Sequence, residues 1–246
     1  MQAITTIDLL NFWEHGMDIN MIRRSIDLLC YASPGMSAEQ IARLSIGERD
    51  TRLLQLRESL FGRRLQNVAE CPECHQRIEW ETDIQDIRLP FPHPGNLHSE
   101  YVLKKDGYTI HFRLPDSNDL LDVIAGNQNG VRPEQLLGKI VTECKFKGNL
   151  CEISELPETI LTALDHRLEV EDQQADIIMS VQCMSCNHQW DIQFDIMSYL
   201  WTEICSWVRH LLQDVGALAR TYGWSEMDIL SMSAARRHIY LEMMTE

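Results

Sequence analysis

Apolar residues recur at helical spacing along the first part of the chain. Two segments, Asp8–His15 and Asp18–Tyr31, place them three and four positions apart, which predicts amphipathic helices. Ser37 opens a capping-box pattern and Ser45 precedes a longer apolar stripe, so each is expected to begin a further helix. The sequence therefore predicts an N-terminal helical region over residues 1–65.

The hydrophobic period changes to two soon afterwards. Ile78, Trp80 and Thr82 alternate with acidic residues, as in a strand with one covered face. Residues 101–114 form two short apolar runs around an Asp-Gly pair, which favours a tight β-hairpin turn. We therefore predict a β region over residues 66–115, which includes this hairpin and the first of two cysteine pairs.

Helical spacing returns in the second half of the chain. Residues 116–174 are predicted to be a helical insertion, because polar N-cap residues at 116–118 and a proline at 133 each precede apolar positions at helical spacing. Residues 175–195 again read as two strands, around the second cysteine pair. The strongest helix then opens a C-terminal helical region over residues 196–246. Its apolar stripe consists of Met197, Leu200, Trp201, Ile204, Trp207, Val208, Leu211, Leu212, Val215 and Leu218.

Four cysteines occur as two C-x-x-C pairs, Cys71 with Cys74 and Cys183 with Cys186. This spacing forms a knuckle that points two thiolates at one metal ion, and two knuckles complete a tetrahedral shell. The long segment between the pairs is compatible with a shared site, because each doubling of a closed loop costs only about 0.6 kcal/mol. We therefore predict one structural zinc ion per chain, bound by these four cysteines in the first (66–115) and second (175–195) knuckle regions.

The alternative is that the two pairs are unrelated buried or redox-active cysteines. Thioredoxin-type chemistry needs its motif at a strand-to-helix turn, where the helix lowers the pKa of a thiol, whereas strands are expected on both sides here. His75 and Asn187 follow the second cysteine of each pair, and both residue types tolerate the left-handed backbone expected there. Four thiolates leave no open position for water, so the metal is expected to be structural.

Composition restricts the partners and the compartment. The 246-residue chain has a net charge of −15, from 22 Lys+Arg and 37 Asp+Glu, and lacks the basic face that nucleic acid or an anionic membrane would attract. We therefore expect neither as a partner. No apolar run approaches the about 20 residues of a spanning helix and no signal pattern opens the chain, so a cytoplasmic location is expected. In that compartment the remaining cysteines are expected to be small packed side chains: Cys30, Cys144, Cys151 and Cys205.

The order of several segments resembles a known family. The segments are Gly47–Gly62 followed by Cys71–Cys74, and Cys183–Cys186 followed by Phe194–Trp201 and Tyr222–Leu230. Together they resemble the baseplate hub assembly chaperones of contractile-tailed phages and of extracellular contractile injection systems. The resemblance spans roughly residues 45–90 and 175–246, and residues 91–174 carry little of it. It implies a cytoplasmic protein that helps the hub or baseplate of an injection particle to assemble, and it implies no catalytic residue.

The predicted fold class is α+β, with a zinc-ribbon-like β module of two C-x-x-C knuckles between N-terminal and C-terminal helical regions. The chain carries no hydrolase, phosphate-loop or dinucleotide motif, so we expect a non-enzymatic protein. The first functional hypothesis is an assembly chaperone for a baseplate or hub protein. The others are a permanent structural part of the baseplate and a C-x-x-C redox protein. Trp201 and Trp207 are the candidate contacts to a protein partner, although the first expectation for the apolar stripe that contains them is burial in the core.

Overall fold

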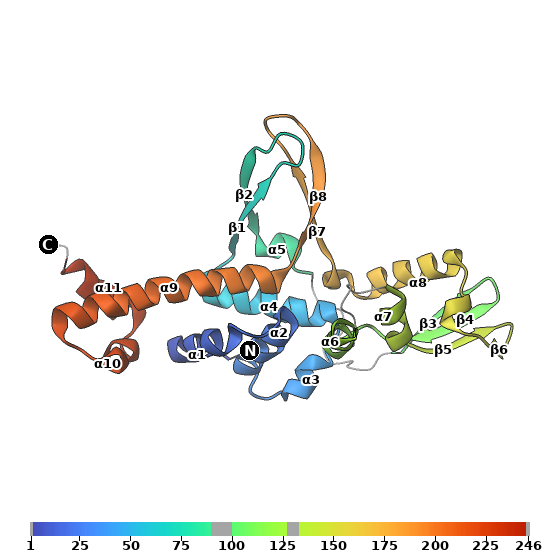
Figure 1. The fold of residues 1–246 in the computed structure, drawn as a ribbon, viewed down its shortest axis with the longest axis horizontal. Coiled ribbons are helices and arrows are strands. Elements are labelled where there is room, and N and C mark those ends of the chain that lie inside the picture. Colours follow the sequence, from blue (N-terminus) through green and yellow to red (C-terminus); the bar gives the residue numbers. More distant parts are fainter. Residues whose placement is uncertain (1, 90–99, 127–132, 245–246) are drawn as a thin grey trace.

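Helices from both ends of the chain form one elongated body in the computed structural model, which describes residues 2–89, 100–126 and 133–244 (Figure 1). The largest core cluster lies in this body and includes Phe12, Leu29, Leu53 and Leu200. The helices of the body are α1 (Thr6–Gly16), α2 (Met21–Ala32), α3 (Ala38–Ala42), α4 (Ile46–Phe61), α9 (Ile196–Tyr222), α10 (Glu226–Ser231) and α11 (Ala234–Glu242).

Capping residues define the ends of these helices where the sequence predicted them. Ser37 forms a reciprocal capping box at α3, and the Ser45 hydroxyl accepts the N–H of Glu48 at the start of α4. The long helix α9 begins after its N-cap Asp195 and ends at Gly223, whose φ of 70° is the left-handed conformation that glycine adopts readily. The predicted N-terminal and C-terminal helical regions are therefore both present.

The apolar stripe of α9 is narrower than predicted. Ile204, Val208 and Leu211 are buried, whereas Leu212 is 39% exposed and does not belong to the core. The reason is that the body covers α9 along one face only, while a position one residue further round the helix points away from that face. The described part of the chain has no helix that combines the length and the apolar content needed to cross a bilayer.

Two antiparallel hairpins project from the body side by side (Figure 1), and we call them the hairpin arm. They form separate two-stranded sheets rather than one continuous sheet. At the base of the arm, Leu65 and Ile177 are buried in the core of the body. The arm consists of β1 (Arg64–Glu70), β2 (Arg77–Asp83), β7 (Ile177–Gln182) and β8 (Gln189–Phe194), and the short helix α5 (Ile84–Ile87) follows β2.

The chain between the two hairpins forms a second α/β unit at the end of the molecule opposite the C-terminus (Figure 1). Its sheet has the strand order β3-β4-β5-β6, and small core clusters pack between this sheet and the helices. The elements are β3 (Tyr101–Lys105), β4 (Tyr108–Phe112), α6 (Ser117–Ala125), α7 (Pro133–Ile140), β5 (Val141–Phe146), β6 (Asn149–Leu150), η1 (Ile153–Glu155), α8 (Glu158–Glu171) and η2 (Gln173–Ala175).

This unit corrects two expectations. The segment 116–174 is not purely helical, because it contributes β5 and β6. The hairpin of β3 and β4 was grouped with the first cysteine pair, but β4 pairs with β5, with Ile110 opposite Cys144. Helix α7 ends at Ile140 and β5 begins at the next residue, Val141, without a turn residue between them, so periodicity alone did not reveal the change from helix to strand.

Candidate metal centre

The two C-x-x-C motifs form the tips of the hairpin arm and have the same backbone geometry. In the first, Cys71 N–H donates to the carbonyl of Gln76, and His75 N–H donates to the carbonyl of Cys71. The second motif repeats both bonds. His75 has a φ of 57° and Asn187 a φ of 60°, so both residues adopt the left-handed conformation that the sequence predicted. Each turn therefore presents its two thiols from one side of a tight loop.

The four sulfur atoms meet where the two tips touch. The Sγ atoms of Cys71, Cys74, Cys183 and Cys186 all lie within 4.8 Å of one another. The pairs Cys71–Cys186 and Cys74–Cys183 are 3.6 Å apart. Four sulfurs placed tetrahedrally around zinc, at Zn–S distances of about 2.3 Å, lie about 3.8 Å from one another. The predicted ligand set is thus brought together and could hold a metal ion, while zinc as its identity and the zinc-ribbon fold stay predictions.

The four thiols lie so close together that their pKa values differ. Burial opposes ionisation of Cys183, but N–H groups of Cys186 and Ser185 and the neighbouring thiols outweigh it and lower the pKa of Cys183 to about 6. An N–H bond from His188 favours the Cys186 thiolate, yet burial and the three other thiols raise the pKa of Cys186 to about 12. Burial and the hydrogen bonds among these thiols thus resist loss of the Cys186 proton. A bound divalent cation removes that resistance because it stabilises thiolates.

Neither histidine beside the motifs belongs to this ligand group. His75 Nδ1 lies 2.8 Å from Glu70 Oε1 on the surface of the arm. The His188 ring stacks on Trp190 at a centroid distance of 5.8 Å. Among the described residues, the four cysteines are the one group of three or more histidine, cysteine or acidic side chains close enough to share a metal ion.

The two candidate partner-binding tryptophans lie on α9, away from the cysteines. Trp201 is half-buried; Phe12 meets it edge-on, and the Arg24 guanidinium lies 3.9 Å from its ring centroid. Trp207 is also half-buried and packs against the core of the body. Both side chains therefore have partners within the protein, and their role in binding another protein stays a prediction.

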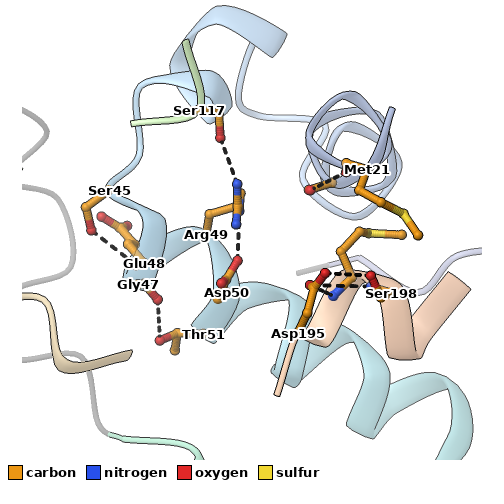
Figure 2. A network of polar contacts seen from close by, with 12 residues as sticks. Met21, Ser45, Gly47, Glu48, Arg49, Asp50, Thr51, Ser117, Asp195 and Ser198 are labelled. Atoms are coloured by element: carbon orange, nitrogen blue, oxygen red, sulfur yellow. Dashed lines mark hydrogen bonds and ion pairs between the residues drawn. The ribbon is translucent and has the colours of Figure 1, made fainter. Parts of the chain in front are cut away.

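The sequence did not predict a buried polar network at the start of α4 (Figure 2). Arg49 is 7% exposed; its Nε donates to Asp50 at 2.7 Å and its Nη1 donates to Ser117 on α6 at 3.3 Å. Burial raises the pKa of Asp50, Arg49 opposes that change, and Asp195 adds to it. The network connects α4 to α6. It also brings the Asp50 carboxylate near that of Asp195, the N-cap residue of α9.

Asp172 links the same helix to the segment that enters the second cysteine motif. Its carboxylate accepts the N–H of Gly47 at 3.0 Å and the hydroxyl of Ser45 at 3.1 Å. Burial raises the pKa of Asp172 to about 6, although these two bonds oppose the change. A side chain at position 47 would overlap this carboxylate, since an added Cβ would lie 2.1 Å from Asp172 Oδ1. Glycine at this position therefore permits the close approach.

A second buried ion pair lies at the base of the hairpin arm. Arg57, with a side chain 2% exposed, donates from Nε and Nη2 to the two carboxylate oxygens of Glu203 at 2.9 and 2.5 Å. The Tyr199 hydroxyl donates to the carbonyl of Gln66 in β1. These contacts attach α9 to both α4 and the first hairpin. The available signal was a charged residue inside an apolar stripe, because Arg57 is four positions after Leu53.

Comparison with known proteins gives one match. Residues 22–200 match the family model described as T4 bacteriophage base plate protein, and no curated protein and no solved structure matches. The matched range contains the four cysteines of the candidate metal centre, the buried network of α4 and the whole hairpin arm. It covers well over half of the 246-residue chain. The protein therefore belongs to the T4 bacteriophage base plate protein family.

Proposed function

We propose that this baseplate-related protein is a non-enzymatic assembly factor, a chaperone for the baseplate or hub of a phage tail or contractile injection system. The observation that carries the proposal is the family match over residues 22–200. The resemblance of the segments around the cysteine motifs and in the C-terminal helices to hub assembly chaperones supports the finer role. In this proposal the protein binds a hub protein before the baseplate closes and is released afterwards.

The cysteine cluster has a structural role in this proposal. A four-thiolate shell around zinc has no open position, so the metal activates neither water nor substrate. Its contribution is to join two hairpins that are far apart in sequence and are not paired to one another by strand hydrogen bonds. One zinc ion per chain then fixes the shape of the arm.

The second candidate is a permanent structural component of the baseplate. The description of the matched family, base plate protein, favours it. Both candidates require binding to other baseplate proteins, with neither nucleic acid nor a membrane as partner. They differ in whether the protein remains in the finished particle.

A C-x-x-C redox protein is the third candidate, and the sulfur geometry favours the metal site over it. Sulfur atoms of different motifs lie 3.6 Å apart, Cys71 from Cys186 and Cys74 from Cys183, so the four thiols form one cluster rather than two separate pairs. Strands flank both motifs, so no helix N-terminus follows either cysteine pair to lower a thiol pKa. Stoichiometric zinc in protein purified without added metal would support the metal site, and metal-free disulfide-bonded protein would support the redox candidate.

Gene deletion with complementation tests the assembly role. We expect the deletion strain to make no complete particles and to accumulate hub protein in the insoluble fraction, and the wild-type gene to restore both. A Cys183→Ser/Cys186→Ser gene should fail to restore them, whereas the matched control Cys205→Ser should succeed. Normal particle numbers and soluble hub protein in the deletion strain would refute the proposal.

A further inference from the structure

Two cysteines outside the candidate metal centre face each other across the hairpin of β5 and β6. Strand β6 pairs with β5 through Lys145 opposite Leu150. The next position of this register places Cys144 opposite Cys151, and Cys151 N–H donates to the Cys144 carbonyl at 3.1 Å. The register is fixed by the two-residue turn Lys147-Gly148, with φ values of 49° and 88°, a conformation that suits tight hairpins.

The sulfur atoms of this pair are closer than those of the metal centre. Cys144 Sγ and Cys151 Sγ lie 2.7 Å apart, compared with 3.6 Å for Cys71–Cys186 and for Cys74–Cys183. Non-bonded carbon atoms prefer separations of about 3.5–4.0 Å, so the separation of the Cys144 and Cys151 sulfurs is shorter than an ordinary non-bonded contact. Directly opposed residues of a hydrogen-bonded antiparallel pair have a Cα separation of about 5.5 Å, which lies within the range that a disulfide spans. In the described part of the chain no third metal ligand joins them, so a second metal centre is not indicated.

We propose that Cys144 and Cys151 are a redox modification site, which forms an intramolecular disulfide by exchange with a low-molecular-mass disulfide such as oxidised glutathione. Cys151 is half-buried and meets the oxidant first, while Cys144 is 5% exposed. Burial and the neighbouring Cys151 thiol raise the pKa of Cys144 to about 12, which is consistent with this order.

The exchange balances without any further reactant. The Cys151 thiolate attacks one sulfur of oxidised glutathione, breaks its S–S bond and releases one glutathione thiolate. Cys144 then loses its proton and attacks the Cys151 sulfur of the mixed disulfide, which releases the second glutathione thiolate. Two protein thiols are oxidised to one disulfide, one oxidised glutathione is reduced to two thiols, and the two protein protons end on the two glutathione molecules.

The bond would fix the weakest edge of the second α/β unit. Strand β6 comprises only Asn149 and Leu150, and Leu150 is 76% exposed. Cys144 belongs to a small core cluster with Ile110 and Ile160, against which Cys151 packs. Oxidation therefore attaches the edge strand covalently to the core of the sheet. Amide exchange over residues 147–156 is expected to slow in the oxidised protein.

Non-reducing peptide mapping of the intact, metal-loaded protein tests the proposal. The protein is incubated with oxidised or with reduced glutathione, free thiols are alkylated, and trypsin is added without reductant. Trypsin cuts after Lys145 and Lys147, between the two cysteines, so the disulfide would link peptide 140–145 to peptide 148–167. We expect this linked pair with oxidised glutathione and its loss after reduction.

Variants identify the order of attack. Cys144→Ser should abolish the linked peptides and leave glutathione attached to Cys151, because the resolving thiol is missing. The control Cys205→Ser should give the same linked pair as the wild type. Full alkylation of Cys144 and Cys151 in the wild type after incubation with oxidised glutathione would overturn the proposal. A Cys151 disulfide with any other cysteine of the chain would overturn it too.

Discussion

Removing the metal should unfold the hairpin arm and leave the helical body folded. In the arm, Leu65 and Ile177 at the base are the strand residues buried in the core of the body. The remainder consists of two separate two-stranded sheets that meet at the cysteine cluster. A two-stranded hairpin on its own is at most marginally stable in water. A metal ion bound by the four cysteines would therefore be the main interaction that holds the outer part of the arm together.

The magnitude follows from comparing the metal with the rest of the fold. Structural zinc contributes an apparent 10–16 kcal/mol or so in small peptides, and a whole domain has a net stability of about 5–15 kcal/mol. Loss of a zinc ion from this site would thus remove more stabilising free energy than the outer strands can replace. Helix α9 buries Leu200 and Ile204 in the body, independently of the cysteines. We therefore expect local unfolding of the arm rather than global unfolding.

Hydrogen exchange with and without a strong zinc chelator measures this difference. Amides of residues 66–82 and 178–193 should lose protection after chelation, while those of α4 and α9 keep it. The variant Cys183→Ser/Cys186→Ser should reproduce the loss, and Cys205→Ser should not. Unchanged protection of the arm after complete metal removal, verified by elemental mass spectrometry, would refute the reasoning. So would simultaneous loss of protection in α9.

Two further predictions concern the buried charges. Glu203→Ala should lower the free energy of unfolding by about 3–5 kcal/mol, because it leaves the buried Arg57 unpaired, whereas Glu39→Ala removes an exposed ion pair and should cost at most about 1 kcal/mol; urea unfolding that gives equal losses would contradict this. Burial raises the pKa of Asp172 from 3.8 to about 6, so its contribution to stability is present below pH 3.8 and lost as the pH rises through 6. Relative to Asp172→Asn, wild-type stability should therefore fall by about 2–3 kcal/mol between pH 4 and pH 7, and parallel pH profiles of the two proteins would contradict the assignment.

Local signals in the sequence predicted the helix ends and the four-cysteine cluster. Ser37, Ser45 and Asp195 cap helices because each needs only backbone N–H groups within the next three residues. A C-x-x-C motif likewise sets the geometry of its own turn, so two motifs predicted a four-cysteine cluster without knowledge of the chain between them. These features depend on neighbours in the sequence, and they are therefore readable from it.

Features that depend on distant residues were not predictable in the same way. Strand β5 forms by pairing with β4, where Ile110 lies opposite Cys144. The local sequence pattern does not indicate this pairing, because β5 directly follows a helix. Arg49 looks like a solvent-exposed charge of a helix until Ser117, from a remote segment, covers it, and Glu203, the partner of Arg57, lies 146 positions further along the chain. The close approach of Cys144 and Cys151 also becomes apparent only once the register of their hairpin is known.

The copy number of this protein in finished particles tests the proposed transient role most directly. Purified mature particles and assembly intermediates from the same culture would be compared by quantitative mass spectrometry with isotope-labelled peptides. The chaperone proposal predicts that the protein accompanies the hub protein in intermediates and is nearly absent from mature particles. A fixed copy number in mature particles that matches the symmetry of the baseplate would contradict this and would establish the protein as a permanent component.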